Sequence, residues 1–277
     1  MGKGSGLIGN FKGKVGNMVG YHLKDSNNKQ TQGVRVYQPV VKNPKTYAQS
    51  EQRAKLFPII ATYRLLKSII DRGQESKPYG NKSRLAWLHD AMLQFDGAWI
   101  AKGKPFGCPA RVQITKGSLP NPLNWTYDGS SLIVAFPVAA AQAPTTVAAV
   151  STSLLAGYPQ LKAGDQVTLI VIRSKNEQLS PWIVSFLLDT SDSTTLAELG
   201  LSAGTSGLEM NITGDSAAAT IVLSREGASG EHLRTNSALV INNELIADYF
   251  GDENKQLAAE SYMAGGSNTD WAEEAIQ

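Results

Sequence analysis

The sequence predicts an α+β protein in which the helices precede most of the strands. Two amphipathic segments lie within residues 46–104, and about seven short strand-like segments follow between residues 105 and 247. Charge is the third observation. Residues 1–116 carry 20 basic and 6 acidic side chains (net +14), whereas residues 117–277 carry 6 basic and 18 acidic ones (net −12). This division indicates two surfaces of opposite sign, one of them suited to polyanions.

Residues 1–45 are expected to form a Gly/Lys-rich arm with one short strand. Residues 1–20 hold seven glycines, and glycine loses the most backbone entropy on ordering, so we expect a flexible arm unless a partner orders it. Residues 33–41 alternate like a strand, which Pro39 restricts to an edge. The glycine spacing fits neither a dinucleotide fingerprint nor a phosphate loop.

Residues 46–104 are expected to form an antiparallel helical hairpin. The first helix spans about 45–71, is capped by Thr46, and is kinked or interrupted at Pro58. The second spans about 82–100, with Asn81 or Ser83 as its cap. Its core face is expected to hold four apolar side chains at helical spacing: Leu85, Leu88, Met92 and Phe95.

Residues 105–247 are expected to form an antiparallel Ig-like β-sandwich, because turn signals separate the apolar segments. The candidate strands are Arg111–Thr115, Ser131–Val138, Gln166–Ser174, Trp182–Leu188, Leu208–Thr213, Ala218–Ser224 and Ser237–Asn242. The Ala-rich segment 139–150 is interpreted as a loop or loose edge, and 193–201 as one short helix.

Residues 248–277 are expected to form an acidic C-terminal tail. Six acidic side chains accompany a single lysine, Lys255. Its apolar and aromatic residues are candidates for docking the tail: Tyr249, Phe250, Tyr262, Met263 and Trp271.

Neither catalytic nor metal-ligating residues are predicted. The three histidines are far apart in the sequence, and a single cysteine, Cys108, excludes an internal disulfide and cysteine-rich zinc sites. His89 and Asp90 are adjacent helix positions, which do not face each other. No apolar run reaches the length of a membrane-spanning helix, and we expect neither a secretory signal nor a cofactor.

The basic N-terminal half is the best candidate site. Clustered cations favour nucleic acid through counterion release, and aromatic rings stack on unpaired bases. The arm inserting into a neighbouring subunit, or a solvated basic face, explains the same pattern. The candidate contact residues for nucleic acid or a subunit are Lys3, Lys12, Lys14, Lys24, Lys29, Arg35, Lys42, Lys45, Arg53 and Lys55, with Phe11, Tyr21 and Tyr37 for stacking or anchoring.

Several phrases of the sequence also match a family pattern. The matched positions are Gly13, Lys14, Val15, Gly16, Val19 and Gly20, then Arg35 and Pro39, then Asn43, Pro44, Thr46, Gln49 and Arg53. They resemble the opening of a domain family of unknown function from gut bacteria, whose genes look similar to those of phages and other mobile elements. Segments 111–120 and 234–243 resemble the first and last strands of that family's β domain. The resemblance implies no catalytic residue, and it does not extend beyond Asp248.

The sequence therefore favours a structural protein of a phage virion or mobile element, not an enzyme. The β domain is expected to mediate assembly, as a homo-oligomer or with other virion proteins, in the virion or the host cytoplasm. The Gly/Lys arm is expected to contact nucleic acid or a neighbouring subunit. A non-virion nucleic-acid-binding accessory protein and a surface adhesion module are the alternatives.

Overall fold

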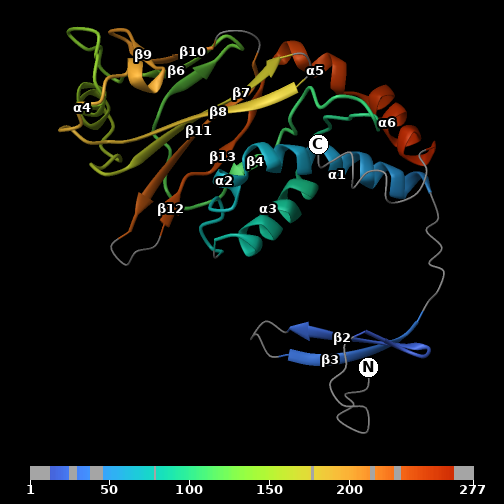
Figure 1. Ribbon diagram of the computed structural model, residues 1–277. Coiled ribbons are helices and arrows are strands. Elements are labelled where there is room, and N and C mark those ends of the chain that lie inside the picture. The colour runs from blue at the N-terminus through green and yellow to red at the C-terminus, as the bar shows by residue number, and fades with distance from the viewer. Residues whose placement is uncertain are drawn as a thin grey trace. The chain divides into compact units, whose positions relative to one another are not determined.

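The computed structural model describes residues 13–24, 30–37, 46–77, 79–175, 178–212, 216–227 and 232–264. The chain divides into two compact units, Met1–Lys45 and Thr46–Gln277. The described residues contain both helices and antiparallel sheets, so the predicted α+β class is confirmed (Figure 1).

The first unit contains a three-stranded antiparallel sheet in the order β1 (Gly13–Val15), β2 (Met18–Lys24), β3 (Gln30–Val36). Val15 pairs with Met18, so Gly16 and Asn17 form a two-residue hairpin turn, and Gly16 has the positive φ of 58° that such a turn needs. The expectation of a flexible arm is therefore wrong for residues 13–24. The predicted strand at 33–41 overlaps β3, while Pro39 lies outside the described residues.

The second unit begins with helices α1 (Tyr47–Leu65), α2 (Lys67–Ile70) and α3 (Asn81–Leu93). The predicted cap is confirmed, because the Thr46 side chain accepts a hydrogen bond from the Gln49 backbone N at 3.4 Å. Pro58 does not interrupt α1. The helix continues past it, and the Thr62 hydroxyl donates to the Pro58 carbonyl at 2.8 Å. The break falls instead at Leu66, between α1 and α2.

The prediction for the second helix is wrong in its end, its cap and its buried face. Helix α3 ends at Leu93, and Gly80 occupies the cap position. Ser83 is buried and its hydroxyl donates to the Ile70 carbonyl at 2.9 Å, so it joins two helices instead of capping one. Trp87 lies on the buried face, whereas Leu85 is 54% exposed.

Two larger antiparallel sheets follow in this unit. One has the order β5 (Trp125–Tyr127), β6 (Ser131–Ala135), β10 (Gly207–Asn211), β9 (Ser202–Ala203). The other has the order β12 (His232–Arg234), β11 (Ser216–Glu226), β7 (Gln166–Lys175), β8 (Gln178–Leu187), and β14 (Val240–Ile241) also pairs with β11. A short ladder joins β4 (Gln113–Thr115) to β13 (Ser237–Ala238). Each predicted strand segment contains a strand, whereas β5, β9 and β12 were not predicted.

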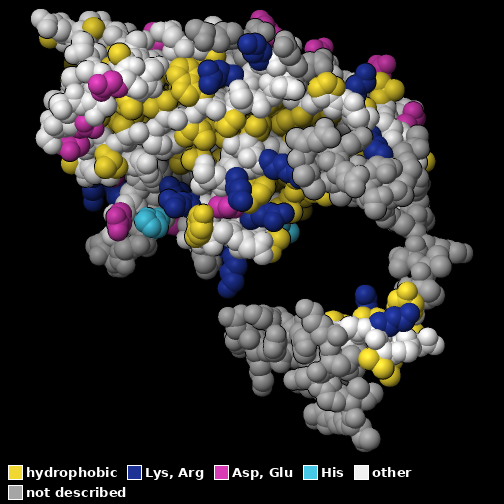
Figure 2. All heavy atoms as spheres, in the orientation of Figure 1, with side chains coloured by type: hydrophobic (Ala, Val, Ile, Leu, Met, Phe, Trp, Pro, Cys, Tyr) yellow, Lys and Arg dark blue, Asp and Glu magenta, His cyan; other side chains and the backbone are white. Residues whose placement is uncertain are grey.

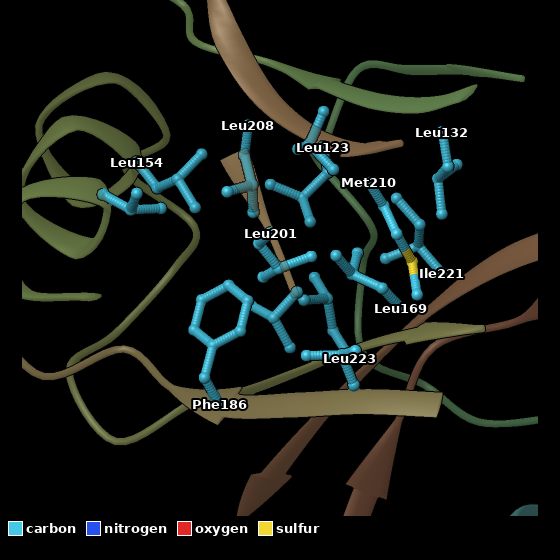
Figure 3. Packing of buried hydrophobic residues seen from close by; sticks show 14 of the residues in the cluster. Leu123, Leu132, Leu154, Leu169, Phe186, Leu201, Leu208, Met210, Ile221 and Leu223 are labelled. Atoms are coloured by element: carbon cyan, nitrogen blue, oxygen red, sulfur yellow. The ribbon is translucent and has the colours of Figure 1, made fainter. Parts of the chain in front are cut away.

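The two larger sheets enclose one hydrophobic core, shown in Figure 3. Leu132 and Met210 come from the first sheet, and Leu169, Ile221 and Leu223 from the second. Paired antiparallel sheets around a shared core agree with the predicted sandwich. Its Ig-like topology stays a prediction.

The opposite face of the second sheet packs on the helices. Ile170 and Ile172 of β7 alternate with Leu169 and are likewise fully buried, in a second core that includes Ile59 of α1 and Trp87 of α3. This core spans residues of both the predicted helical hairpin (46–104) and the predicted β domain (105–247).

The segments predicted as a loop and a tail are partly helical. Helix α4 (Val147–Gly157) replaces the end of the predicted loop, with Thr146 as its cap and Val150 and Leu154 buried. A single 3-10 turn, η1 (Ala197–Leu199), lies within the short helix predicted at 193–201.

Helices α5 (Asn243–Tyr249) and α6 (Asp252–Ala264) cover most of the described C-terminal segment. Helix α6 docks on α1, because Ala258 and Tyr262 form a small core with Ala54, and the Lys255 Nζ lies 3.0 Å from the Glu51 Oε1. The tail prediction is thus corrected to a docked helix through residue 264. Tyr262 is buried, Met263 is 37% exposed, and Trp271 lies outside the described residues.

Candidate functional site

The N-terminal sheet gathers four of the predicted contact residues on one face. Lys14 is paired with Val19, which is paired with Arg35, and residues directly opposite each other in a sheet share a face. Tyr21 and Tyr37 lie two residues from Val19 and Arg35, on that same face. The Lys14 Nζ lies 3.5 Å from the centroid of the Tyr37 ring, a cation–π contact. We call Lys14, Tyr21, Arg35 and Tyr37 the basic–aromatic face.

Gly33 determines how Tyr21 lies on this face. Tyr21 pairs with Gly33, and a Cβ atom at position 33 would be 2.6 Å from the Tyr21 Cζ. Such a separation is shorter than any ordinary carbon–carbon contact. The ring therefore lies flat across β3 because position 33 has no side chain.

The opposite face of the sheet is apolar and exposed. Val15, Met18 and Val36 lie side by side across the three strands, and Val34 is on the same face beside Gly20. Their exposed fractions are 56%, 38%, 74% and 51% for Val15, Met18, Val36 and Val34. A sheet of this size has little core of its own, and its stability depends on packing against another surface. We call these four residues the apolar face.

The remaining predicted contact residues are not brought to this site. Lys24 belongs to β2. Arg53 and Lys55 are half-buried on α1 in the second unit, where the Lys55 Nζ lies 5.3 Å from the Phe95 ring centroid. The other predicted residues lie outside the described residues: Lys3, Phe11, Lys12, Lys29, Lys42 and Lys45.

The groups considered for catalysis have structural surroundings. Burial raises the pKa of the Cys108 thiol to about 12, so the thiol is protonated at neutral pH. The His89 Nδ1 lies 3.4 Å from the Asp90 Oδ1, on an exposed surface where the Lys116 Nζ also bonds Asp90 at 2.9 Å. Among the described residues, no three His, Cys, Asp or Glu side chains are grouped to hold a metal ion.

Sequence reasoning did not single out Arg72 or Tyr79, which lie in or beside the α2–α3 connection. The Arg72 guanidinium lies over the exposed Tyr79 ring, 5.2 Å from its centroid. The stretch of six cations from Arg64 to Arg84 is the sequence signal that points to this surface.

Comparison with known proteins gives no relative for this fold or site. No protein-family model, curated protein or solved structure matches the chain. In the described part of the chain, none of the helices has the length and apolar character required to span a bilayer.

Proposed function

We propose that the protein is a structural assembly protein of a phage virion or mobile element, in which the N-terminal sheet of one copy docks on a neighbouring copy. The apolar face carries this proposal. Three valines and a methionine are presented together on a sheet of three short strands, and burying them is a favourable term in association. The phage or mobile-element setting rests on the resemblance of residues 13–53.

Charge supports a second copy as the partner. The first unit has eight basic residues and one acid, a net charge of +7, and the second has 18 basic residues and 23 acids, a net charge of −5. Opposite net charges favour contact between the first unit of one chain and the second unit of another, with a rate that falls as salt rises. In this proposal the second unit, including its Ig-like β domain, supplies the receiving surface.

The test is the mass of the full-length protein by light scattering over a range of concentrations and salt. Val34→Thr combined with Val36→Thr keeps β-branched side chains while placing hydroxyls on the apolar face. Val138→Thr with Val240→Thr makes the same change at two valines of the second unit that are 72% and 43% exposed. We expect the native chain and the control to assemble and the V34T/V36T chain to be monomeric. A native chain that stays monomeric, or a V34T/V36T chain that assembles normally, contradicts the proposal.

The basic–aromatic face favours a second candidate function, a nucleic-acid-binding accessory protein. Lys14 and Arg35 provide cations for phosphates, and Tyr21 and Tyr37 provide rings for bases. Lys14→Gln with Arg35→Gln then weakens binding to single-stranded DNA without changing the mass of the assembly. If this variant binds DNA as the native chain does, the face has no such role.

A further inference from the structure

A second basic and aromatic surface lies on the helical layer of the second unit, formed by the end of α1, by α2 and by the start of α3. Arg64, Lys67 and Tyr79 line a common hollow. Arg72 lies over Tyr79, and the Arg84 guanidinium lies over Tyr63, 5.1 Å from its ring centroid. We call Arg64, Lys67, Arg72, Tyr79 and Arg84 the helical basic surface. Figure 2 shows dark-blue side chains gathered over the region of α2 and α3.

Few carboxylates oppose these cations. Residues 64–84 hold six basic and two acidic side chains, a net charge of +4. Within the described ranges, none of Arg64, Lys67, Arg72 and Arg84 has a carboxylate oxygen within 4.0 Å. Exposed cations in such a group repel one another, and a polyanion relieves that repulsion while releasing its own counterions.

The two acidic side chains of the segment are held by other partners. Asp71 lines the hollow but is only 6% exposed, and its Oδ1 accepts a hydrogen bond from the Tyr63 hydroxyl at 2.8 Å. Glu75 accepts from the Ser118 backbone N at 2.8 Å and the Arg234 backbone N at 3.0 Å. Phosphates therefore meet the cations at the rim of the hollow, away from the Asp71 carboxylate at its floor.

Tyr79 distinguishes a nucleic acid from other polyanions. Its side chain is 69% exposed, although it is large and aromatic, and it lies among the cations instead of in a core. A ring that is free to stack on a base, surrounded by cations that track a phosphate backbone, is the pattern of sequence-tolerant single-strand binding. An acidic protein segment uses the cations but gains nothing from an exposed stacking ring.

We propose that the helical basic surface binds single-stranded nucleic acid, with Arg64, Lys67 and Arg72 on phosphates and Tyr79 stacked on a base. The inference rests on the second unit alone, and it holds whether or not the N-terminal sheet mediates assembly.

The experiment measures the anisotropy of a short fluorescein-labelled oligothymidine with the full-length protein across a salt series. The variant is Arg64→Gln, Lys67→Gln and Arg72→Gln together, all exposed in the structure. The matched control, Lys104→Gln with Lys162→Gln and Lys175→Gln, removes the same charge at exposed positions elsewhere in the second unit. At about 0.7 counterions per contact, three lost phosphate contacts reduce the log–log salt slope by about 2 and the affinity at 0.1 M salt by on the order of 100-fold.

Tyr79 has its own pair of variants. Tyr79→Ala is expected to weaken oligothymidine binding on the order of tenfold, and Tyr79→Phe, which keeps the ring, to leave it unchanged. Neither substitution is expected to alter binding of heparin, a polyanion without bases.

Three results overturn the inference. The first is a native chain that does not bind oligothymidine. The second is an R64Q/K67Q/R72Q variant that binds as the control does, including the case in which only K14Q/R35Q loses affinity. The third is a helical variant whose sole effect is a lower assembly mass, which assigns the surface to an acidic protein partner. Because mass and anisotropy are separate readouts, failure of the assembly proposal is distinguishable from failure of this one.

Discussion

Replacing Trp87 by alanine tests whether the helical layer and the second sheet form one folding unit. Trp87 is 1% exposed, its Nε1 donates to the Gln113 carbonyl at 2.7 Å, and it packs in the core that also contains Ile172 of β7. A buried aromatic side chain removes about 150–250 Å² from water, which gives an upper bound of about 4–6 kcal/mol at 25 cal/mol per Å². Measured losses for tryptophan to alanine are about 3–5 kcal/mol, so we expect about 4 kcal/mol.

Urea unfolding followed by circular dichroism and by tryptophan fluorescence measures this loss. Because Trp87 joins helix and sheet, both signals are expected to shift together, and the melting temperature to fall by about 8–16 °C. Leu85→Ala on the same helix is the control. Leu85 is 54% exposed, so its replacement is expected to cost less than about 1 kcal/mol. Separate helical and β transitions with only the helical one shifted, or equal losses in the two variants, would refute this reasoning.

Three further outcomes follow from the geometry. Burial raises the pKa of Glu75, but hydrogen bonds from Ser118 and Arg234 outweigh it and the net pKa is lowered. Glu75→Gln is therefore expected to destabilise by about 1–2 kcal/mol at neutral pH, and the difference from the native chain should shrink as pH falls below about 4, where the native carboxylate is protonated; acid titration of the unfolding midpoint measures this. Cys108, with a pKa of about 12, is expected to react with a thiol reagent only when urea unfolds the chain, and rapid labelling of the native protein would contradict its burial. Gly33→Ala is expected to displace the Tyr21 ring and speed proteolysis within the N-terminal sheet, whereas Gly204→Ala, where a Cβ meets nothing within 4 Å, should not.

Local signals predicted the elements with strong punctuation. Thr46 follows an Asn-Pro turn and precedes a helical pattern, and its side chain caps α1 as expected. The continuous apolar runs of β7 and β11 identified both strands. A run without alternation also indicates burial on both faces, which is what the two cores show.

Tertiary packing decided what the periodicity of α3 could not. Leu85 and Trp87 are two residues apart and lie on different sides of the helix, and either side has apolar residues enough to serve as a core face. The sheet behind α3 accepts Trp87 because the Gln113 carbonyl of β4 is placed to receive its N–H. That partner lies 26 residues away in the sequence, so periodicity within the helix carries no trace of it.

Two elements were missed through the interpretation of composition. Helix α4 was assigned to a loop because its segment is rich in alanine, although Val147, Val150 and Leu154 have helical spacing and are buried. Gly16-Asn17 is a two-residue hairpin signal between alternating residues, and it was interpreted as part of a flexible arm.

The candidate site shows most directly where prediction from sequence ends. Composition identified Lys14, Arg35, Tyr21 and Tyr37 as contact residues, but only the strand register determines whether cations and valines share a face. A shift of one residue in β3 would move Arg35 to the face of Val15 and Met18 and leave no face that is either apolar or basic. The Tyr21–Gly33 pair opposes such a shift, because any other residue of β3 opposite Tyr21 brings a Cβ into its ring. The assembly and nucleic-acid proposals for the N-terminal sheet therefore both depend on Gly33.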